Sequence, residues 1–232
     1  SKCMENTFRD VNIALANELA KICEKIGINA WEVIELANKH PRVNLHQPGP
    51  GVGGHCLAVD PWFIVEKNPE IAKIIQLSRK TNDSMPEYIM NKIDEILMDI
   101  KGTKKISILG ITYKPNIDDI RESPIIKLID MIDKRNDYEI SVYDPYVKNH
   151  KYQAKNVIDA AKNSDLIVLA VHHDDFKNLP LSDMANVMRN MNFFDTRNFI
   201  NREKVEEKGF KYILLGEGKN KYYIKNCLDE VA

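Results

Sequence analysis

The residues best suited to chemistry lie between positions 47 and 61, where a run rich in glycine and proline leads to a single cysteine. Glycine lacks the Cβ atom that would hold a substrate away from the main chain, so Gly53 is predicted to bring the backbone close to a substrate. Such a loop presents its reactive side chain, and we predict that Cys56 is a nucleophile. Asp60, one helical turn further on, is either a second catalytic group or, because Pro61 follows it, the cap of a helix.

A second group of polar residues lies on the first predicted helix. Apolar residues recur every three or four positions from residue 2 to residue 26, which predicts one long amphipathic helix that ends at Gly27. Lys2, Asn6 and Arg9 fall on the opposite face, which is solvated in the simplest interpretation. The apolar stripe packs either on its own domain or on a second copy of itself. Its members are Phe8, Val11, Leu15, Leu19, Ile22 and Ile26.

The N-terminal half is predicted to be helical around the cysteine loop. Asn29 opens a capping box, and Ser84 is predicted to cap the second part of an interrupted helix. The sequence Lys-Gly-Thr after residue 100 marks a boundary, so we divide the chain into a helical domain, residues 1–101, and a second domain, residues 102–232. The predicted helices in the first domain cover residues 2–26, 29–40 and 70–101.

The second half alternates short apolar runs, rich in β-branched residues, with segments of helical length. This alternation is typical of an open, doubly wound parallel sheet. The predicted fold class is therefore α/β, with an all-helical central domain followed by a Rossmann-like sheet domain. Ser123, followed by proline, and Asn201 are predicted to start two of its helices. The predicted strands are residues 106–113, 139–143, 166–171, 193–194 and 212–215.

Ligands of such sheets bind beyond the carboxyl ends of the strands. The first of these ends, residues 110–114, lacks the G-x-G-x-x-G pattern of a dinucleotide site, so a mononucleotide is expected there and NAD is not. Lys114 and Arg197 are predicted to contact phosphate or uracil oxygens, and Tyr113 to stack on the base. Taken singly, each of the three is more simply interpreted as an ordinary surface residue.

The composition excludes several classes of function. With 33 Lys and Arg against 34 Asp and Glu, there is no electrostatic basis for binding nucleic acid or a membrane surface. No apolar run approaches the roughly 18 residues of a spanning helix. The four cysteines include no C-x-x-C pair, and the adjacent His172 and His173 lack a third ligand, so no metal is predicted. Reduced thiols fit the cytoplasm. Cys3 and Cys23 are interpreted as small apolar helix residues, and Cys227 as part of a polar tail.

Three motifs together resemble the UDP-glucose/GDP-mannose dehydrogenase family of nucleotide-sugar oxidases, and the likeness runs through almost the whole chain. They are Lys-Cys-Met-Glu-Asn at residues 2–6, Gly-Gly-His-Cys at residues 53–56 with Asp60, and residues 110–124. Within the family, residues 40–44 and 55–63 resemble the branch that acts on UDP-N-acetyl-D-mannosamine. The glucose and GDP-mannose branches usually carry serine before the cysteine.

The resemblance implies an enzyme that oxidises the primary alcohol of a UDP-sugar to a carboxylate and reduces two NAD. Cys56 would add to the intermediate aldehyde, giving a thiohemiacetal and then a thioester. Asp60 would assist the water that hydrolyses the thioester. Lys2 and Asn6, one turn apart, would stabilise the oxyanions, and Lys2 and the helix that starts near Asp60 would favour the thiolate.

The resemblance also implies binding roles and partners. Lys114 and Arg197 would hold the UDP, Arg42 would contact the substrate across a dimer, and Arg121 would approach the NAD pyrophosphate of the neighbouring subunit. A homodimer through the long first helix is implied. So is an N-terminal NAD-binding Rossmann domain that this chain does not contain, and the chain is therefore expected to be a catalytically incomplete fragment.

Three alternatives stay open. The substrate could be another nucleotide sugar, such as UDP-N-acetylglucosamine or UDP-glucose. The chain could be a non-catalytic module that binds nucleotide sugars and dimerises. It could also be a thiol hydrolase or acyltransferase in which Cys56 acts with His55 or His172, although the adjacent His55 is poorly placed as a base.

Overall fold

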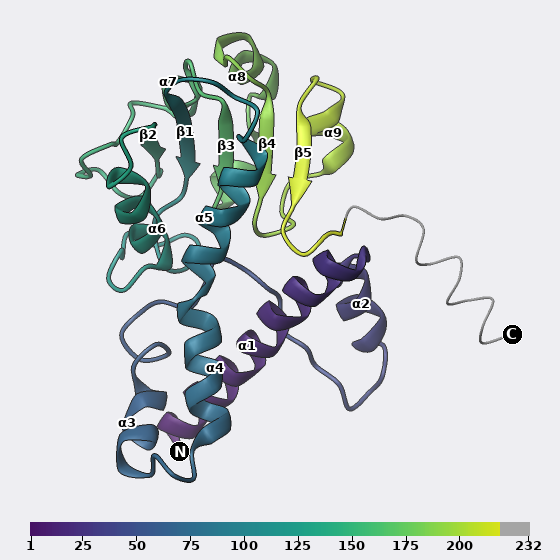
Figure 1. Ribbon diagram of the computed structural model, residues 1–232, viewed down its shortest axis with the longest axis vertical. Coiled ribbons are helices and arrows are strands. Elements are labelled where there is room, and N and C mark those ends of the chain that lie inside the picture. Colours follow the sequence, from purple (N-terminus) through teal and green to yellow (C-terminus); the bar gives the residue numbers. More distant parts are fainter. Residues whose placement is uncertain (219–232) are drawn as a thin grey trace, which may run out of the picture.

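The computed structural model describes residues 1–218, so Cys227 lies outside the described residues. Figure 1 shows a group of helices around the long helix α1 (Lys2–Ile26) and a twisted sheet with helices on both faces. This is the α/β architecture that the sequence predicts. Helix α5 (Met85–Ile96) connects the two parts of the molecule.

The helical part is built around α1, and the predicted ends of its helices are largely confirmed. Gly27 adopts a φ of 85°, and its N–H bonds to the Cys23 carbonyl, as expected for a helix C-terminus. The Asn29 side chain accepts a hydrogen bond from the Trp31 N–H and caps the next helix, which ends before His40. α1 packs against α2 (Ala30–Ala37), α3 (Asp60–Lys67) and α4 (Lys73–Asp83).

The two faces of α1 are reversed relative to an ordinary surface helix. Four of the six residues of its apolar stripe are exposed, including Phe8 at 61% and Leu15 at 51%, and Val11 and Leu19 are half-buried. Much of its polar side is buried, with exposed fractions of 2% for Asn6 and 0% for Asp10 and Asn17, while Lys2 and Arg9 are exposed. The solvated face is therefore a wrong interpretation for Asn6. The side of α1 that packs against the rest of the chain carries the hydrogen-bonding residues. The exposed apolar side is available for contact with another surface.

A buried network of polar side chains joins α1 to α4 and to the glycine-rich loop. Asn17 accepts a hydrogen bond from the Gly49 N–H at 2.9 Å and donates to Asn82 Oδ1 at 2.9 Å. Asn82 donates to Asp10 at 2.8 Å, and Asp10 pairs with Arg79 at 2.5 Å. Burial raises the pKa of Asp10 even though the Arg79 guanidinium acts in the opposite direction. These bonds lie away from water, so the loop is held firmly on α1.

Helices α4 and α5 form one nearly continuous column (Figure 1). Only Ser84 separates them, and its N–H makes a helical bond to the Lys80 carbonyl at 3.0 Å. Ser84 makes no capping bond and donates instead to the Thr81 carbonyl, so the predicted serine cap is wrong. The interruption coincides with Pro86, which has no N–H to offer to the carbonyl of Asn82.

Helix α5 contributes to the core of the sheet. Met85, Ile89 and Ile93 are fully buried in the same apolar cluster as Ile108 of the first strand. The sheet therefore packs on residues that precede position 102. The division of the chain at residues 101 and 102 stays a prediction.

The sheet contains five parallel strands in the described residues, in the order β2-β1-β3-β4-β5. This order confirms the predicted doubly wound topology. Because β1 pairs with β2 on one side and β3 on the other, the winding reverses beside β1, where ligands of such sheets bind. The strands are β1 (Lys104–Leu109), β2 (Tyr138–Tyr143), β3 (Leu166–Leu169), β4 (Asn192–Asp195) and β5 (Lys211–Leu214).

Helices cover both faces of the sheet. Alternation along β1 places Ile106 in the core under α5 and α6, and Leu109 in the core of the opposite face. Ser123 and Asn201 cap α6 and α9, as predicted. None of the helices within residues 1–218 is both long and apolar enough to cross a membrane. The covering elements are α6 (Pro124–Asp133), α7 (Val157–Ala161), the 3-10 helix η1 (Asp174–Asn178), α8 (Leu181–Val187) and α9 (Arg202–Glu206).

Candidate active site around Cys56

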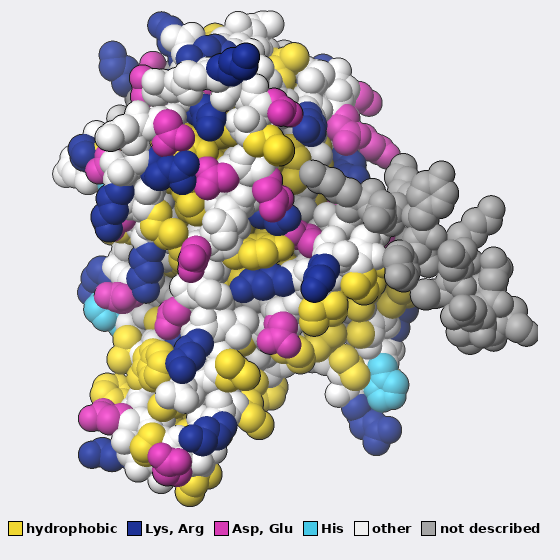
Figure 2. All heavy atoms as spheres, in the orientation of Figure 1, with side chains coloured by type: hydrophobic (Ala, Val, Ile, Leu, Met, Phe, Trp, Pro, Cys, Tyr) yellow, Lys and Arg dark blue, Asp and Glu magenta, His cyan; other side chains and the backbone are white. Residues whose placement is uncertain are grey.

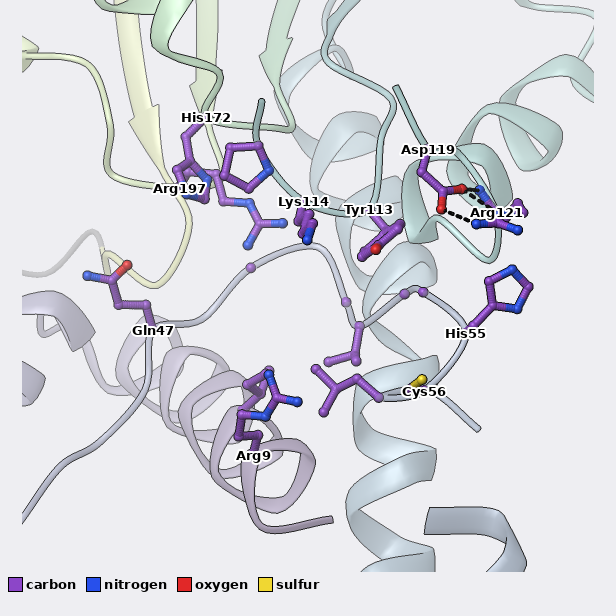
Figure 3. A pocket seen from close by; sticks show the side chains of 18 residues that line it. Arg9, Gln47, His55, Cys56, Tyr113, Lys114, Asp119, Arg121, His172 and Arg197 are labelled. Atoms are coloured by element: carbon purple, nitrogen blue, oxygen red, sulfur yellow. Dashed lines mark hydrogen bonds and ion pairs between the residues drawn. The ribbon is translucent and has the colours of Figure 1, made fainter. Parts of the chain in front are cut away.

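A cavity of about 480 Å³ lies between the helical part and the carboxyl edge of the sheet. Cys56 and Arg9 border it from the helical part, and Lys114, His172 and Arg197 border it from the sheet (Figure 3). The predicted nucleophile and the predicted phosphate-binding residues thus face one space, although they come from distant parts of the chain.

Glycines allow the loop before Cys56 to lie directly against the sheet domain. A Cβ atom at Gly53 would lie 2.4 Å from the Glu122 carbonyl oxygen. A Cβ atom at Gly54, whose φ is 86°, would lie 2.8 Å from the Tyr113 ring. Any larger residue would therefore push the loop away from the sheet. Gly53 and Tyr113 also line the cavity, and their roles toward a substrate stay predictions.

Asp60 faces α1 and does not act as a helix cap. Its N–H bonds to the Cys56 carbonyl at 2.8 Å, which places the two residues one turn apart. Asp60 is the first residue of α3, and the cap position is Val59, which makes no side-chain bond. The Asp60 Oδ2 atom accepts a hydrogen bond from Asn6 Nδ2 at 2.6 Å. The capping interpretation of Asp60 is therefore wrong, and its carboxylate lies beside the cysteine segment.

Asn6 stands between a carboxylate and a cation. Its amide nitrogen donates to Asp60, and its Oδ1 accepts from Arg9, which lines the cavity. Lys2, one turn before Asn6, is exposed and is not one of the lining residues. Asn6 is therefore in contact with the predicted catalytic carboxylate, while the roles of Lys2 and Asn6 toward an oxyanion stay predictions.

The turn that carries Lys114 is supported by a buried histidine–aspartate pair. His173 Nε2 lies 3.0 Å from Asp144 Oδ2, and His173 Nδ1 accepts from the Asn116 N–H at 2.9 Å. Because Nδ1 accepts, the proton of the neutral ring lies on Nε2 and faces the carboxylate. Burial alone would raise the pKa of Asp144, but hydrogen bonds from His173 and the Ile111 N–H hold it below its usual value. The pair fixes the turn.

Arg197 and His172 form the wall of the cavity at the ends of β4 and β3. Arg197 donates to the Ala170 carbonyl at 3.1 Å, and Gly49 leaves room for its guanidinium. Burial lowers the pKa of Arg197 to about 10, so it stays charged at neutral pH. Burial, and then the Arg197 charge, lower the pKa of His172 to about 4. His172 Nδ1 is buried without a hydrogen-bond partner in the described structure.

Arg121 lies at the rim of the cavity beside His55 (Figure 3). Its guanidinium makes two bonds to Asp119, at 2.9 and 2.7 Å. These bonds lower the pKa of Asp119 to about 2. Arg42 lies in the exposed loop after α2 and is not a lining residue of this cavity. The roles of Arg121 toward NAD and of Arg42 toward a substrate stay predictions.

The end of β1 does not fit a dinucleotide. In a dinucleotide site the first turn leads at once into a helix, whose N-terminal amides hold the pyrophosphate. Here residues 110–123 intervene before α6, and the Ile111 N–H is already bonded to Asp144 at 2.7 Å. Nor does any group of three or more His, Cys, Asp or Glu among residues 1–218 form a metal site.

The cavity also contains residues that sequence reasoning left without a role in the dehydrogenase. Arg9 follows Asn6 by one turn, so helical spacing places the two residues on the same face. The sequence could therefore have predicted that Arg9 lies near the site. His172 follows a predicted strand end, but its position beside Arg197 depends on the pairing of β3 with β4, which the sequence does not show. The unassigned lining residues include Arg9, Gln47, His55, Asp119 and His172.

Two family models match the chain. The central domain of the UDP-glucose/GDP-mannose dehydrogenase family matches residues 1–84, and the UDP binding domain of the same family matches residues 107–202. The chain belongs to the UDP-glucose/GDP-mannose dehydrogenase family. In this family's terms, Cys56 lies in the central domain and Lys114 and Arg197 lie in the UDP binding domain, so the cavity is formed between the two.

Relatives within the family share the fold and much of the sequence. The UDP-N-acetyl-D-mannosamine dehydrogenase of Methanocaldococcus jannaschii is 51% identical over 223 residues, which cover 94% of this chain and 51% of the relative. The structure of the UDP-N-acetyl-mannosamine dehydrogenase of Staphylococcus aureus superimposes with a TM-score of 0.83 at 45% identity, over 94% of this chain and 50% of that one.

An archaeal structure gives the same result. The UDP-D-ManNAc dehydrogenase of Pyrococcus horikoshii superimposes with a TM-score of 0.85 at 38% identity, over 94% of this chain and 51% of that one. The chain thus spans about half the length of the family members it matches.

Proposed function

We propose that the protein acts as an NAD-dependent dehydrogenase that oxidises UDP-N-acetyl-D-mannosamine to UDP-N-acetyl-D-mannosaminuronate. The observation that carries the proposal is the single cavity with Cys56 on one wall and the cations Lys114 and Arg197 on the other. The substrate is taken from the relatives that bear this name. We assign the activity to the cytoplasm, where thiols stay reduced.

Cys56 carries the covalent step. Its thiolate attacks the aldehyde carbon at C6, a C–S bond forms, and the carbonyl oxygen becomes an oxyanion that takes up a proton. Loss of a hydride from C6 and of the hydroxyl proton from this thiohemiacetal leaves a thioester. Water then attacks the thioester, the C–S bond breaks, and the thiolate leaves as the carboxylate forms. NAD would accept two hydrides in this chemistry, one as the C6 alcohol becomes the aldehyde and one from the thiohemiacetal.

Asn6, Asp60 and Lys2 assist this chemistry. Asp60 accepts a proton from the attacking water, and its contact with Asn6 at 2.6 Å orients the carboxylate. The Asn6 amide has a second hydrogen, which is available to an oxyanion. Lys2 would add a positive charge one turn away.

The sheet side of the cavity binds the nucleotide. Neither Lys114 nor Arg197 forms an ion pair within the described part of the chain, so both are available to the diphosphate of UDP. Tyr113 lies next to Lys114 and presents its ring to the cavity. Gly53 brings main chain to the sugar, and Arg121 at the rim would serve the NAD pyrophosphate of a neighbouring subunit.

The exposed stripe of α1 supports a homodimer. Phe8, Leu15 and Ile22 expose 61%, 51% and 47% of their surfaces, and Figure 2 shows apolar side chains gathered along this part of the molecule. A second copy of α1 would cover the stripe, because the same apolar face meets itself around a two-fold axis. In the dimer, Arg42 of one copy would reach the substrate of the other.

NADH formation by the full-length gene product tests the function. We expect two NADH per molecule of UDP-N-acetyl-D-mannosamine, and much slower turnover of UDP-N-acetylglucosamine, UDP-glucose and GDP-mannose. Cys56→Ser should lower kcat by roughly a thousandfold or more, since the covalent step is lost. The 232-residue chain assayed alone should yield no NADH, because the end of β1 lacks the form of a dinucleotide site.

Cys23→Ala is the matched control. Cys23 is a buried thiol near the C-terminal end of α1, packed with Ala20 and Ala30 and absent from the cavity lining, so this variant should keep near-normal turnover. Unchanged turnover in Cys56→Ser would sink the covalent mechanism and favour a module that binds nucleotide sugars without chemistry. Faster turnover of UDP-glucose would assign the protein to another substrate branch.

A further inference from the structure

Arg9 is a cavity residue without a part in the reaction described above. It lies on α1 one turn after Asn6 and lines the cavity that contains Cys56. Figure 3 shows its side chain rising from α1 toward the segment that carries Cys56. One guanidinium nitrogen donates to Asn6 Oδ1, and the residue as a whole is exposed.

The contact with Arg9 decides which way the Asn6 amide points. A guanidinium only donates hydrogen bonds, and an ionised carboxylate only accepts them. Arg9 therefore requires the amide oxygen on its side, and Asp60, 2.6 Å from Asn6 Nδ2, requires the nitrogen on the other side. An amide between neutral neighbours could turn over, but between these two it has one favourable orientation.

Arg9 also brings a positive charge that is not neutralised. Within residues 1–218 its guanidinium forms no ion pair, whereas Arg121 at the rim is paired with Asp119 at 2.7 Å. The carboxylate of Asp60 is bonded to Asn6 and reaches Arg9 only through it. The wall near Cys56 therefore carries a guanidinium that has no carboxylate partner within residues 1–218, a group well suited to an oxyanion or a carboxylate.

We propose that Arg9 is a positioning residue of the cysteine site. It holds the Asn6 amide with its nitrogen toward Asp60, and it keeps positive charge beside Cys56, where an oxyanion and then a carboxylate form. This inference rests on the proposed function, in which Cys56 and Asp60 carry the covalent step. It gives a role in the reaction to a side chain that the sequence leaves on a solvated face.

Turnover of Arg9→Ala in the full-length protein tests the positioning role. We expect kcat to fall by roughly a hundredfold, the effect of displacing a reacting group by about 1 Å, with little change in thermal stability. Arg9→Lys keeps the charge and should recover part of the rate. Guanidinium ion at low millimolar concentration should also restore part of the rate of Arg9→Ala, which a purely structural role would not produce.

Lys25→Ala, an exposed cation in the last turn of the same helix, should keep the wild-type rate. An unchanged kcat in Arg9→Ala, beside an active wild type, would overturn the positioning role. If the wild type forms no NADH from any nucleotide sugar, the proposed function itself has failed. The electrostatic effect of Arg9 on Cys56 is then tested by the alkylation experiment alone.

Alkylation of Cys56 in the 232-residue chain measures that charge without catalysis. Iodoacetate is an anion and iodoacetamide is neutral. The alkylation rate of Cys56 by iodoacetate, divided by its rate with iodoacetamide, therefore reports the local charge, and peptide mass spectrometry measures both rates. Arg9→Ala should lower this ratio about threefold at low salt and less at high salt. Arg9→Lys and Lys25→Ala should keep the wild-type ratio. An equal ratio in Arg9→Ala and wild type would refute a free charge beside Cys56.

Discussion

The side chains of the cavity hold their charges in different ways. Lys114 and Arg197 are cations that no carboxylate neutralises in the described part of the chain, whereas Arg121 is bound to Asp119. His172 contributes no charge near neutral pH, because burial and the neighbouring Arg197 lower its pKa to about 4. A diphosphate would thus meet fixed positive charge beside a neutral imidazole.

His172 should make the protein lose stability in mild acid. Its pKa is about 4 when folded against 6.5 as the unperturbed value, so the unfolded chain binds a proton in this interval and the folded chain does not. The contribution of the neutral ring is complete above pH 6.5 and is lost as the pH falls toward 4. In urea unfolding, the wild type should lose more stability between neutral pH and mild acid than His172→Asn. The exposed His40→Asn serves as control, and identical losses in all three proteins would contradict the assignment.

Single residues were predictable where local composition alone defines them. Cys56 stands in a run of glycines, and Lys114 and Arg197 follow predicted strands, so their approach to one cavity follows from the topology. The role of Asp60 was ambiguous, because an aspartate before a proline is expected both for a helix cap and for a catalytic carboxylate. Only the packing of α3 on α1, which brings distant residues together, separates the two.

Helix α1 and the glycine-rich loop form one structural unit. Asn17 is the link, since it bonds to Gly49 of the loop and to Asn82 of α4. The hydrophobic period predicted the length and the end of α1 correctly. It did not predict which face turns inward, because that choice depends on the buried polar partners, such as Arg79, which lie far away in sequence.

Asn17→Ala should destabilise the protein by about 1 to 3 kcal/mol, because it leaves the buried Gly49 N–H and the Asn82 oxygen without partners. Urea unfolding measures the loss. Asn12→Ala, a half-buried asparagine on the same helix whose side chain donates to the Phe8 carbonyl of its own helix, should cost less than about 0.5 kcal/mol. Equal effects of the two substitutions would show that the network contributes nothing to the fold.

The molecule leaves an apolar surface open along α1, and its assembly should depend on that surface. Leu15→Glu places a charge in the middle of the stripe and should weaken self-association by roughly a hundredfold, since a buried charge without a partner is costly. Sedimentation velocity should show a dimer for the wild type and a monomer for Leu15→Glu. Met98→Glu, at a site 73% exposed outside α1, should leave the dimer intact. A wild type that sediments as a monomer at all concentrations would rule out this interface.

The column of α4 and α5 has a consequence for what the protein selects. The 11 residues of α4, Ser84 and the 12 residues of α5 together rise roughly 36 Å. Asn82 of α4 is bonded to Asp10 of α1, and α5 is embedded in the core of the sheet. The parts of the molecule that carry the two walls of the cavity therefore pack on the same helical column, which favours a fixed spacing between the walls. We expect the protein to discriminate among ligands by length: the distance from diphosphate to reacting carbon must match a gap that does not close.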